Sequence, residues 1–259
     1  MPVAAPASPP VKGPRVRPVP AVSRALAILR LLAANAEPMT LKAISEELDL
    51  VTSTCLHILR VLVQEGMCKV EQGTKRYSLD VGVLSLARSV VENNPFPLRV
   101  QSALDRIAER WNVTTIGMKV SGLEDLVVLA LARSRGPFRL YVEVGSRVPA
   151  LTSATGRIVA HYADLSDNEL ARRFKSLHWE NPPSFDTWLK EVKAVERKGF
   201  ALDRGNYISG ISVLAVPILD AQHRVTHAMA ALGVADTLTA SKVQALATDM
   251  QAEAAGLAQ

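Results

Sequence analysis

The stretch that decides the fold is Thr52–Gly66, Thr-Ser-Thr-Cys-Leu-His-Ile-Leu-Arg-Val-Leu-Val-Gln-Glu-Gly. Its apolar side chains recur at helical spacing, which predicts an amphipathic helix over 52–65. The buried stripe of this helix consists of Cys55, Ile58, Leu59 and Leu62. Gly66 is a typical residue to end a helix, because glycine adopts left-handed backbone at no steric cost. The first turns carry hydrogen-bonding side chains away from the stripe, as expected of a helix that enters a DNA groove.

The segments on both sides complete a recognisable unit. Upstream, apolar residues recur at helical spacing over 22–35, and Thr40 is placed to cap a second helix over 41–48. Downstream, two short β-prone runs flank a Gly-containing turn, which predicts a β-hairpin over 67–79. Three helices followed by a hairpin are the winged form of the helix-turn-helix. Residues 21–78 are therefore predicted to be a DNA-binding domain.

The residues predicted to contact DNA lie on the third helix, at the hairpin tip and beside them. The third helix is expected to read base edges, and the tip is expected to reach the backbone or the minor groove. Each residue alone has an ordinary explanation, since Ser or Thr often only caps a helix and an exposed His or Arg is usually solvated. The prediction depends on their order along the chain. The predicted DNA-binding residues are Arg24, Thr40, Thr52, Ser53, Thr54, His57, Arg60, Lys75 and Arg76.

Charge alone does not identify this DNA-binding domain. The 259 residues carry a net charge of +5, and segment 21–78 has seven basic against six acidic residues. Residues 1–20 are proline-rich and basic, and they are predicted to be a disordered arm, either inert or weakly attracted to phosphates. With two cysteines, no secretory pattern and no apolar run long enough to cross a bilayer, we expect a cytoplasmic protein with no membrane partner and no disulfide framework.

The rest of the chain predicts a linker and a second domain. Segment 79–95 predicts a linker helix, which either mediates dimerisation or packs on its own domain. Segment 96–259 combines helix and strand patterns, which predicts an α+β domain with helices packed on an antiparallel sheet. The expected helices are 98–111, 156–162, 166–174, 185–198 and 240–255, and the expected strands are 114–120, 125–132, 139–144, 211–219 and 225–232.

From Val22 onward, several blocks resemble the IclR family of bacterial transcription regulators. These blocks are Val22-Ser-Arg-Ala-Leu-Ala-Ile-Leu, Met39-Thr-Leu-Lys-Ala-Ile-Ser, Ser53-Thr-Cys-Leu-His-Ile-Leu, Thr74-Lys-Arg-Tyr-Ser-Leu, Thr152-Ser-Ala-Thr-Gly-Arg, Gly199-Phe-Ala-Leu-Asp and Gly210-Ile-Ser-Val-Leu-Ala-Val-Pro-Ile-Leu-Asp. The resemblance implies a winged helix-turn-helix, a linker helix and a GAF-like effector-binding domain in a homodimer or homotetramer. It also implies a repressor or activator of a metabolic operon, with double-stranded operator DNA and a small organic acid as partners.

The same resemblance implies an effector site in the second domain. In the family, backbone N–H groups at the start of the helix near 153–156 face an acid, and a helix N-terminus favours negative charge. The family's His or Lys near this loop is replaced here by Leu151 and Arg157. The implied effector-binding residues are Ser153, Ala154, Thr155, Gly156, Asp203, Tyr207, Ile211, Val213, Ala230 and Leu232.

The wall of the implied pocket departs from the family. Several relatives carry Cys at the position of Val213 and Ser at those of Ala230 and Leu232. Because fewer polar groups line this wall, we predict an effector larger or more apolar than a two- or three-carbon keto acid, for instance an aromatic acid. In the alternative, Tyr207, Arg204 or a water molecule supplies the missing polar contacts.

The residues that carry chemistry give little support to an enzyme. The second domain has no cysteine, and the chain has no Gly-x-Ser-x-Gly elbow, phosphate loop or Gly-x-Gly-x-x-Gly run. His223 and His227 flank a turn and a strand rather than sharing a helix face, which disfavours a zinc site. Asp203 and Tyr207 could act as an acid and a base, but no nucleophile or second carboxylate accompanies them. We therefore expect a non-enzyme without metal or cofactor. The alternatives are a C-terminal domain that converts a metabolite and a purely architectural DNA binder.

Overall fold

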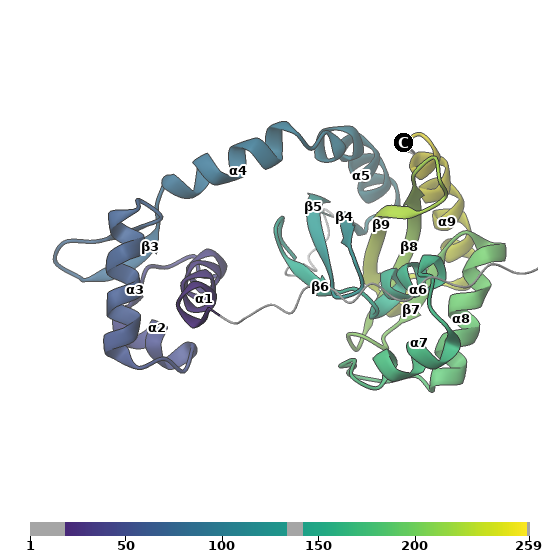
Figure 1. The fold of residues 1–259 in the computed structure, drawn as a ribbon. Coiled ribbons are helices and arrows are strands. Elements are labelled where there is room, and N and C mark those ends of the chain that lie inside the picture. Colours follow the sequence, from purple (N-terminus) through teal and green to yellow (C-terminus); the bar gives the residue numbers. More distant parts are fainter. Residues whose placement is uncertain (1–18, 134–141, 258–259) are drawn as a thin grey trace, which may run out of the picture. The chain divides into compact units, whose positions relative to one another are not determined.

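The computed structural model describes residues 19–133 and 142–257 (Figure 1). The chain divides into two compact units, Met1–Asn93 and Asn94–Gln259, and each is described by itself. Along the described ranges, no helix is long and apolar enough to cross a membrane.

The core of the N-terminal unit consists of three helices and a small sheet (Figure 1). Its elements are α1 (Pro20–Ala34), β1 (Met39–Thr40), α2 (Leu41–Glu47), α3 (Thr52–Gln64), β2 (Cys68–Val70) and β3 (Arg76–Leu79). The apolar stripes of the helices meet the sheet in one core, formed by Ile28, Leu32, Ile44, Cys55, Leu59, Leu62, Cys68 and Tyr77. Because β2 and β3 form an antiparallel hairpin directly after the three helices, the predicted winged helix-turn-helix is confirmed.

The edges of this unit differ from the sequence-based expectation. Strand β1 was not predicted, because two residues are too few to show an alternating pattern; it pairs with β3, giving the order β1-β3-β2. Thr40 caps α2 as predicted, since its hydroxyl accepts a hydrogen bond from the Ala43 N–H at 3.2 Å. Helix α1 begins at Pro20, the last residue of the predicted arm, and residues 1–18 lie outside the described residues.

The N-terminal unit ends in α4 (Gly82–Glu92), where the linker helix was predicted. The Asp80 carboxylate accepts a hydrogen bond from the Val81 N–H at 2.8 Å, just before the helix begins. Gly82 packs so closely that an added Cβ would lie 2.3 Å from the Gly66 carbonyl oxygen. A glycine at this position therefore fixes the start of α4 against the turn that follows α3.

The C-terminal unit is a six-stranded sheet with helices on both faces (Figure 1). Its elements are α5 (Phe96–Trp111), β4 (Thr114–Ser121), β5 (Asp125–Ala132), β6 (Arg147–Pro149), α6 (Ser153–Tyr162), α7 (Asp167–Phe174), α8 (Phe185–Lys198), β7 (Ala201–Arg204), β8 (Ile211–Leu219), β9 (Val225–Val234), a 3₁₀ turn (Ala235–Thr237) and α9 (Ala240–Ala255). The strand order is β6-β5-β4-β9-β8-β7, and every neighbouring pair is antiparallel. The predicted α+β class with an antiparallel sheet is confirmed.

The two faces of the sheet bury separate cores. Successive side chains of a strand point to opposite faces, so Leu214 and Val216 pack towards α5 and α9, whereas Val213 and Ala215 pack towards α6 and α8. Small side chains on the second face, including Ala230, allow α6 to approach the central strands closely.

Two expectations for this unit need correction. The strand predicted over 139–144 falls partly on residues outside the described ranges, and Val142–Val144 are not in a strand. Instead, β6 pairs with β5. The sequence also missed β7, which has four residues and a single neighbour, β8.

Candidate DNA-binding surface and effector site

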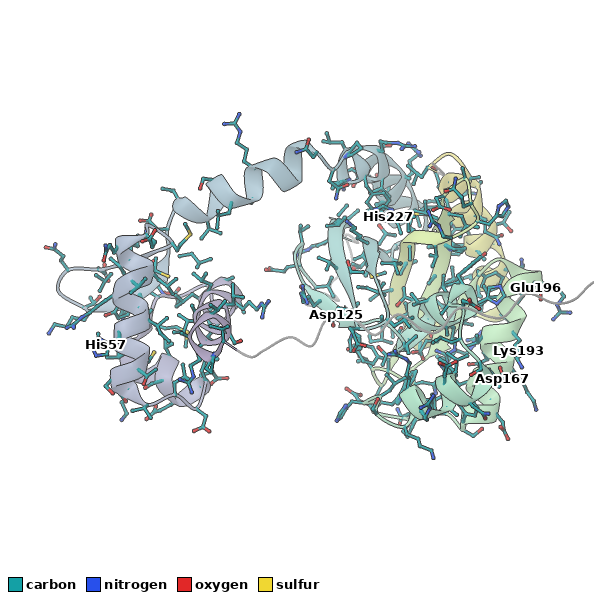
Figure 2. The ribbon with its side chains drawn as sticks, viewed as in Figure 1. His57, Asp125, Asp167, Lys193, Glu196 and His227 are labelled. Atoms are coloured by element: carbon teal, nitrogen blue, oxygen red, sulfur yellow. The ribbon has the colours of Figure 1, made fainter. Side chains whose placement is uncertain are left out.

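Helix α3 presents its polar side chains on the side opposite its buried stripe. Ser53, His57 and Arg60 are exposed, and Figure 2 shows His57 on the side of α3 that faces away from α1. Thr52 is exposed as well, but its hydroxyl lies 3.5 Å from the hydroxyl of the buried Ser45 in α2. Thr54 is half-buried. The structure therefore brings the predicted recognition residues together, with two threonines partly engaged in packing the helix.

The hairpin tip places its two basic side chains differently. The turn uses left-handed backbone at Gly73 (φ 111°) and at Lys75 (φ 54°), and Lys75 is exposed. Arg76 is exposed too, but its guanidinium donates a hydrogen bond to the Pro38 carbonyl at 3.0 Å. Through this hydrogen bond Arg76 connects the wing to Pro38, the residue just before β1, which the sequence did not indicate. Arg24 is exposed on α1.

The start of α6 offers a limited set of donors. Thr152 precedes the helix without a side-chain cap, and the Gly156 N–H already donates to the Thr152 carbonyl at 2.8 Å. The Gly156 N–H is therefore already bonded within the helix, because it is the first N–H that reaches the carbonyl of the N-cap residue. A Cβ at Gly156 would lie 2.1 Å from the Leu151 carbonyl carbon, so close packing requires this glycine. The Ser153 hydroxyl is buried without a hydrogen-bond partner among the described residues.

Asp203 is fully buried at the end of β7 and stabilises the turn after it. Its carboxylate accepts hydrogen bonds from the Asn206 N–H at 2.7 Å and from the Tyr207 N–H at 3.2 Å. Tyr207 is half-buried, and burial raises the pKa of its phenol. Asp203 therefore positions Tyr207 at the edge of the site.

The sheet register explains why the predicted wall residues meet. Asp203 lies opposite Val213, Val213 opposite Leu232, and Leu232 opposite Thr114, and directly opposed residues share a face of the sheet. This row faces α6, together with Ile211 and Ala230. Thr114 was missed, because only the strand pairing connects it with the others.

Arg204 does not belong to that wall. It pairs with Ser212, one residue along from Val213 and hence on the other face of the sheet. Its guanidinium donates to the Leu238 carbonyl at 3.3 Å, on the α9 side. The interpretation in which Arg204 supplies a missing polar contact to the effector is therefore wrong.

Arg157 is the centre of a polar network behind the start of α6. Its side chain is completely buried, and it donates hydrogen bonds to the carboxylate of Glu191 (2.7 Å), the Ser153 carbonyl (2.8 Å) and the side chain of Asn206 (3.0 Å). The Asp203 carboxylate lies 3.8 Å from the same guanidinium. Arg157 thus joins α6, α8 and the β7–β8 turn, and two carboxylates balance its charge.

The indole of Trp179 lies beside this network. The Arg157 guanidinium carbon is 5.9 Å from the centre of the ring, in a cation–π contact. The indole N–H of Trp179 is buried without a partner among the described residues, like the Ser153 hydroxyl. A buried donor without an acceptor costs about 1–3 kcal/mol, so both donors favour a molecule that carries acceptors.

The two histidines suggested as a remote zinc pair lie in different surroundings. His223 is exposed in the turn before β9, whereas His227 stacks on Phe96 at 3.9 Å between ring centres (Figure 2). Burial, with a smaller contribution from the Lys119 charge, lowers the pKa of His227 to about 4. Over the described ranges, no group of three or more His, Cys, Asp or Glu side chains is placed to hold a metal ion.

A winged helix-turn-helix unit joined in one chain to an α+β unit defines the class: a DNA-binding transcriptional regulator with a second, separate domain. The particular family follows from comparison with known proteins. The IclR helix-turn-helix domain matches residues 21–71, and the bacterial transcriptional regulator IclR C-terminal domain matches residues 93–258. The chain belongs to the IclR family of transcriptional regulators.

Individual relatives agree with this assignment. The glycerol operon regulatory protein of Streptomyces coelicolor is 25% identical, over 86% of this chain and 87% of its own length. The Pca regulon regulatory protein of Pseudomonas putida is 27% identical, over 80% of this chain and 72% of its own length. The crystal structure of an IclR transcriptional regulator from Alicyclobacillus acidocaldarius, 24% identical, superposes with a TM-score of 0.77 over 92% of this chain and 97% of that one, which supports the fold.

Proposed function

We propose that this regulator reads a pseudo-palindromic operator with α3 and the wing, and that a small organic acid bound in the C-terminal unit controls its affinity for DNA. The regulated genes form a metabolic operon, and the protein acts in the cytoplasm. Two observations carry the proposal together. Helix α3 exposes a polar face in one unit. The other unit buries the Ser153 hydroxyl and the Trp179 indole N–H, which have no hydrogen-bond partner among the described residues. The names of relatives, which refer to a glycerol operon and a Pca regulon, support an operon-level role.

In the DNA-binding unit, the exposed side chains proposed to contact DNA divide into those that contact base edges and those that contact phosphates. His57 and Arg60 lie on the exposed face of α3, where a helix in the major groove contacts base edges. Lys75 lies at the wing tip, where a cation contacts phosphates whatever the sequence. Arg76 orients the wing through its bond to the Pro38 carbonyl.

In the C-terminal unit, the effector's acid group would lie at the start of α6. The N–H groups of Ser153, Ala154 and Thr155 precede the first residue that is bonded within the helix, and the Ser153 hydroxyl has no partner in the described part of the chain. The Arg157 charge is already balanced, so neutral donors and the helix dipole would stabilise the carboxylate.

The side chains around the proposed acid-binding position favour an effector that also carries an aromatic ring. Val213, Ala230 and Leu232 give the sheet an apolar wall, and Trp179 adds an aromatic ring near Arg157. Aromatic rings pair favourably with other rings and with apolar walls. An aromatic acid therefore fits better than pyruvate or glyoxylate, which are too small to contact the apolar wall.

Apolar side chains that the chain leaves exposed on two helices support a homodimer. Leu84 and Leu86 on α4 are 68% and 64% exposed, and Val22 and Leu26 on α1 are 56% and 45% exposed. Apolar surface of this kind is typical of a protein–protein contact. Further pairing of dimers would give a tetramer.

A thermal-shift screen of purified protein tests the effector proposal. Benzoates and hydroxybenzoates should raise the melting temperature of the wild type, and Ser153→Ala should remove that shift while the exposed control Ser176→Ala retains it. Stabilisation by pyruvate or glyoxylate but by no aromatic acid would overturn the aromatic assignment. Incubation followed by NMR of the small molecule separates binding from catalysis, since a converted metabolite would favour the enzyme alternative.

A further inference from the structure

A cavity lies apart from the proposed effector site, at the β7 edge of the sheet. It is a groove of about 560 Å³ between α8 and α9, and Figure 1 shows both helices at this end of the unit. Its lining residues come from α8, from the strand and turn after it, and from the start of α9. The volume falls within the range of small-molecule sites, which is roughly 300–1,000 Å³.

The charge of the groove is positive. Lys190, Lys198 and Arg204 line it and are all exposed, and Glu191 is the one carboxylate among the lining residues. The Glu191 carboxylate already accepts a hydrogen bond from Arg157 at 2.7 Å, so its charge is largely compensated. The three cations therefore face the groove with little opposing charge.

The floor of the groove adds backbone donors and an apolar surface. Strand β7 pairs only with β8, so alternate N–H and C=O groups of Ala201–Arg204 point away from the sheet, towards the groove. Phe200, Ala194 and Val243 supply apolar lining, and the Lys198 ammonium lies 6.0 Å from the Phe200 ring centre.

We propose that this groove is a second ligand site, for a small organic anion that carries at least two negative charges. Two or more carboxylate or phosphate groups would contact Lys190, Lys198 and Arg204, and outward N–H groups of β7 would bind one of them. An extended peptide is disfavoured, because the strand edge is four residues long and lysines beside an edge block strand addition.

The groove shares two residues with the network behind the effector site. Glu191 and Asn206 line the groove, and both accept hydrogen bonds from Arg157. The Ser153 hydroxyl and the wall residue Val213 are not among the lining residues. The second site therefore lies next to the network behind the proposed effector site but has its own cations, Lys190, Lys198 and Arg204, and it stands whether or not the effector proposal holds.

Calorimetric titration of the full-length protein with citrate and with inorganic pyrophosphate, at fixed ionic strength, tests the proposal. We expect saturable binding of at least one of these anions, weakened about tenfold or more in Lys190→Gln/Lys198→Gln, because two charge-assisted contacts are lost; tenfold corresponds to roughly 1.4 kcal/mol. The matched control Lys175→Gln/Arg197→Gln removes two exposed cations outside the groove and should keep the wild-type affinity. Unchanged melting temperatures show that both double variants fold.

Four results would overturn the proposal. The first is no saturable binding of either anion by the wild type, and the second is an equal loss in the groove and control variants, which would indicate diffuse charge attraction. The third is loss of citrate and pyrophosphate binding in Ser153→Ala with no loss in Lys190→Gln/Lys198→Gln, which would place the anion in the effector site. A hexaglutamate peptide that binds more tightly than both anions, with the same dependence on Lys190 and Lys198, would assign the groove to an acidic chain instead.

Discussion

The two units present their candidate functional residues in opposite ways. In the N-terminal unit, His57, Arg60 and Lys75 are exposed, and the core lies on the other side of α3. In the C-terminal unit, Ser153 and Asp203 are buried and bonded into the structure around them. Function and stability should therefore be separable in the first unit and coupled in the second.

The largest effect should come from Arg157→Met in the C-terminal unit. The substitution leaves the buried Asp203 carboxylate without its cation and removes three hydrogen bonds. We expect a loss of about 3 kcal/mol in the free energy of unfolding, measured by urea denaturation. Arg172→Met changes an exposed arginine and serves as the control. A cost below about 1 kcal/mol for Arg157→Met would show that the network is not structural.

The matching change in the N-terminal unit should affect DNA binding and not stability. His57→Ala is expected to weaken binding to the operator by about 1–3 kcal/mol, because a base-edge contact is lost, with no change in melting temperature. Fluorescence anisotropy with operator and random duplexes gives the comparison. Equal losses on the two duplexes would argue against base reading by His57.

A third prediction concerns pH and the buried His227. Its folded-state pKa, about 4, is below the ordinary value of 6.5, so folding favours the neutral ring. The stability that depends on this ring is complete above pH 6.5 and is lost as the pH falls towards 4, by up to about 3 kcal/mol. His227→Gln should flatten this part of the pH–stability curve, whereas the exposed His223→Gln should not. Identical curves for wild type and His227→Gln would contradict the assignment.

The smallest effect is expected at the wing. Lys75→Gln should weaken binding to all duplexes by about 1 kcal/mol or less and lower the slope of log affinity against log salt by about one, as for a single phosphate contact. Arg76→Gln should instead alter the wing itself, because its hydrogen bond to Pro38 is lost. A sequence-dependent loss for Lys75→Gln would mean that the wing reads bases.

The length of an element decides whether the sequence predicts it. The helices of the N-terminal unit follow from apolar periodicity and from the cap at Thr40, and the long strands β8 and β9 from their apolar runs. Strands β1 and β7 have two and four residues, too few for a pattern, and their existence depends on pairing with distant segments.

The candidate effector site was predictable only in part. Asp203 and Val213 were named from the family resemblance, but that they oppose each other depends on sheet register. Arg157 looks in sequence like a surface cation, and nothing local indicates that Glu191, 34 positions away, accepts its hydrogen bond inside the fold. Arg204, considered as one alternative source of polar contacts to the effector, lies on the other face, because a shift of one residue along a strand changes the face.

The central claim is that occupancy of the C-terminal site changes how the N-terminal unit binds DNA. The most direct test measures the affinity of the full-length protein for its operator with and without a saturating benzoate or hydroxybenzoate, in the wild type and in Ser153→Ala. We expect a change of about fivefold or more in the wild type, of the size typical of coupled sites, and none in the variant. Equal operator affinity with and without a ligand that demonstrably saturates the wild type would contradict it.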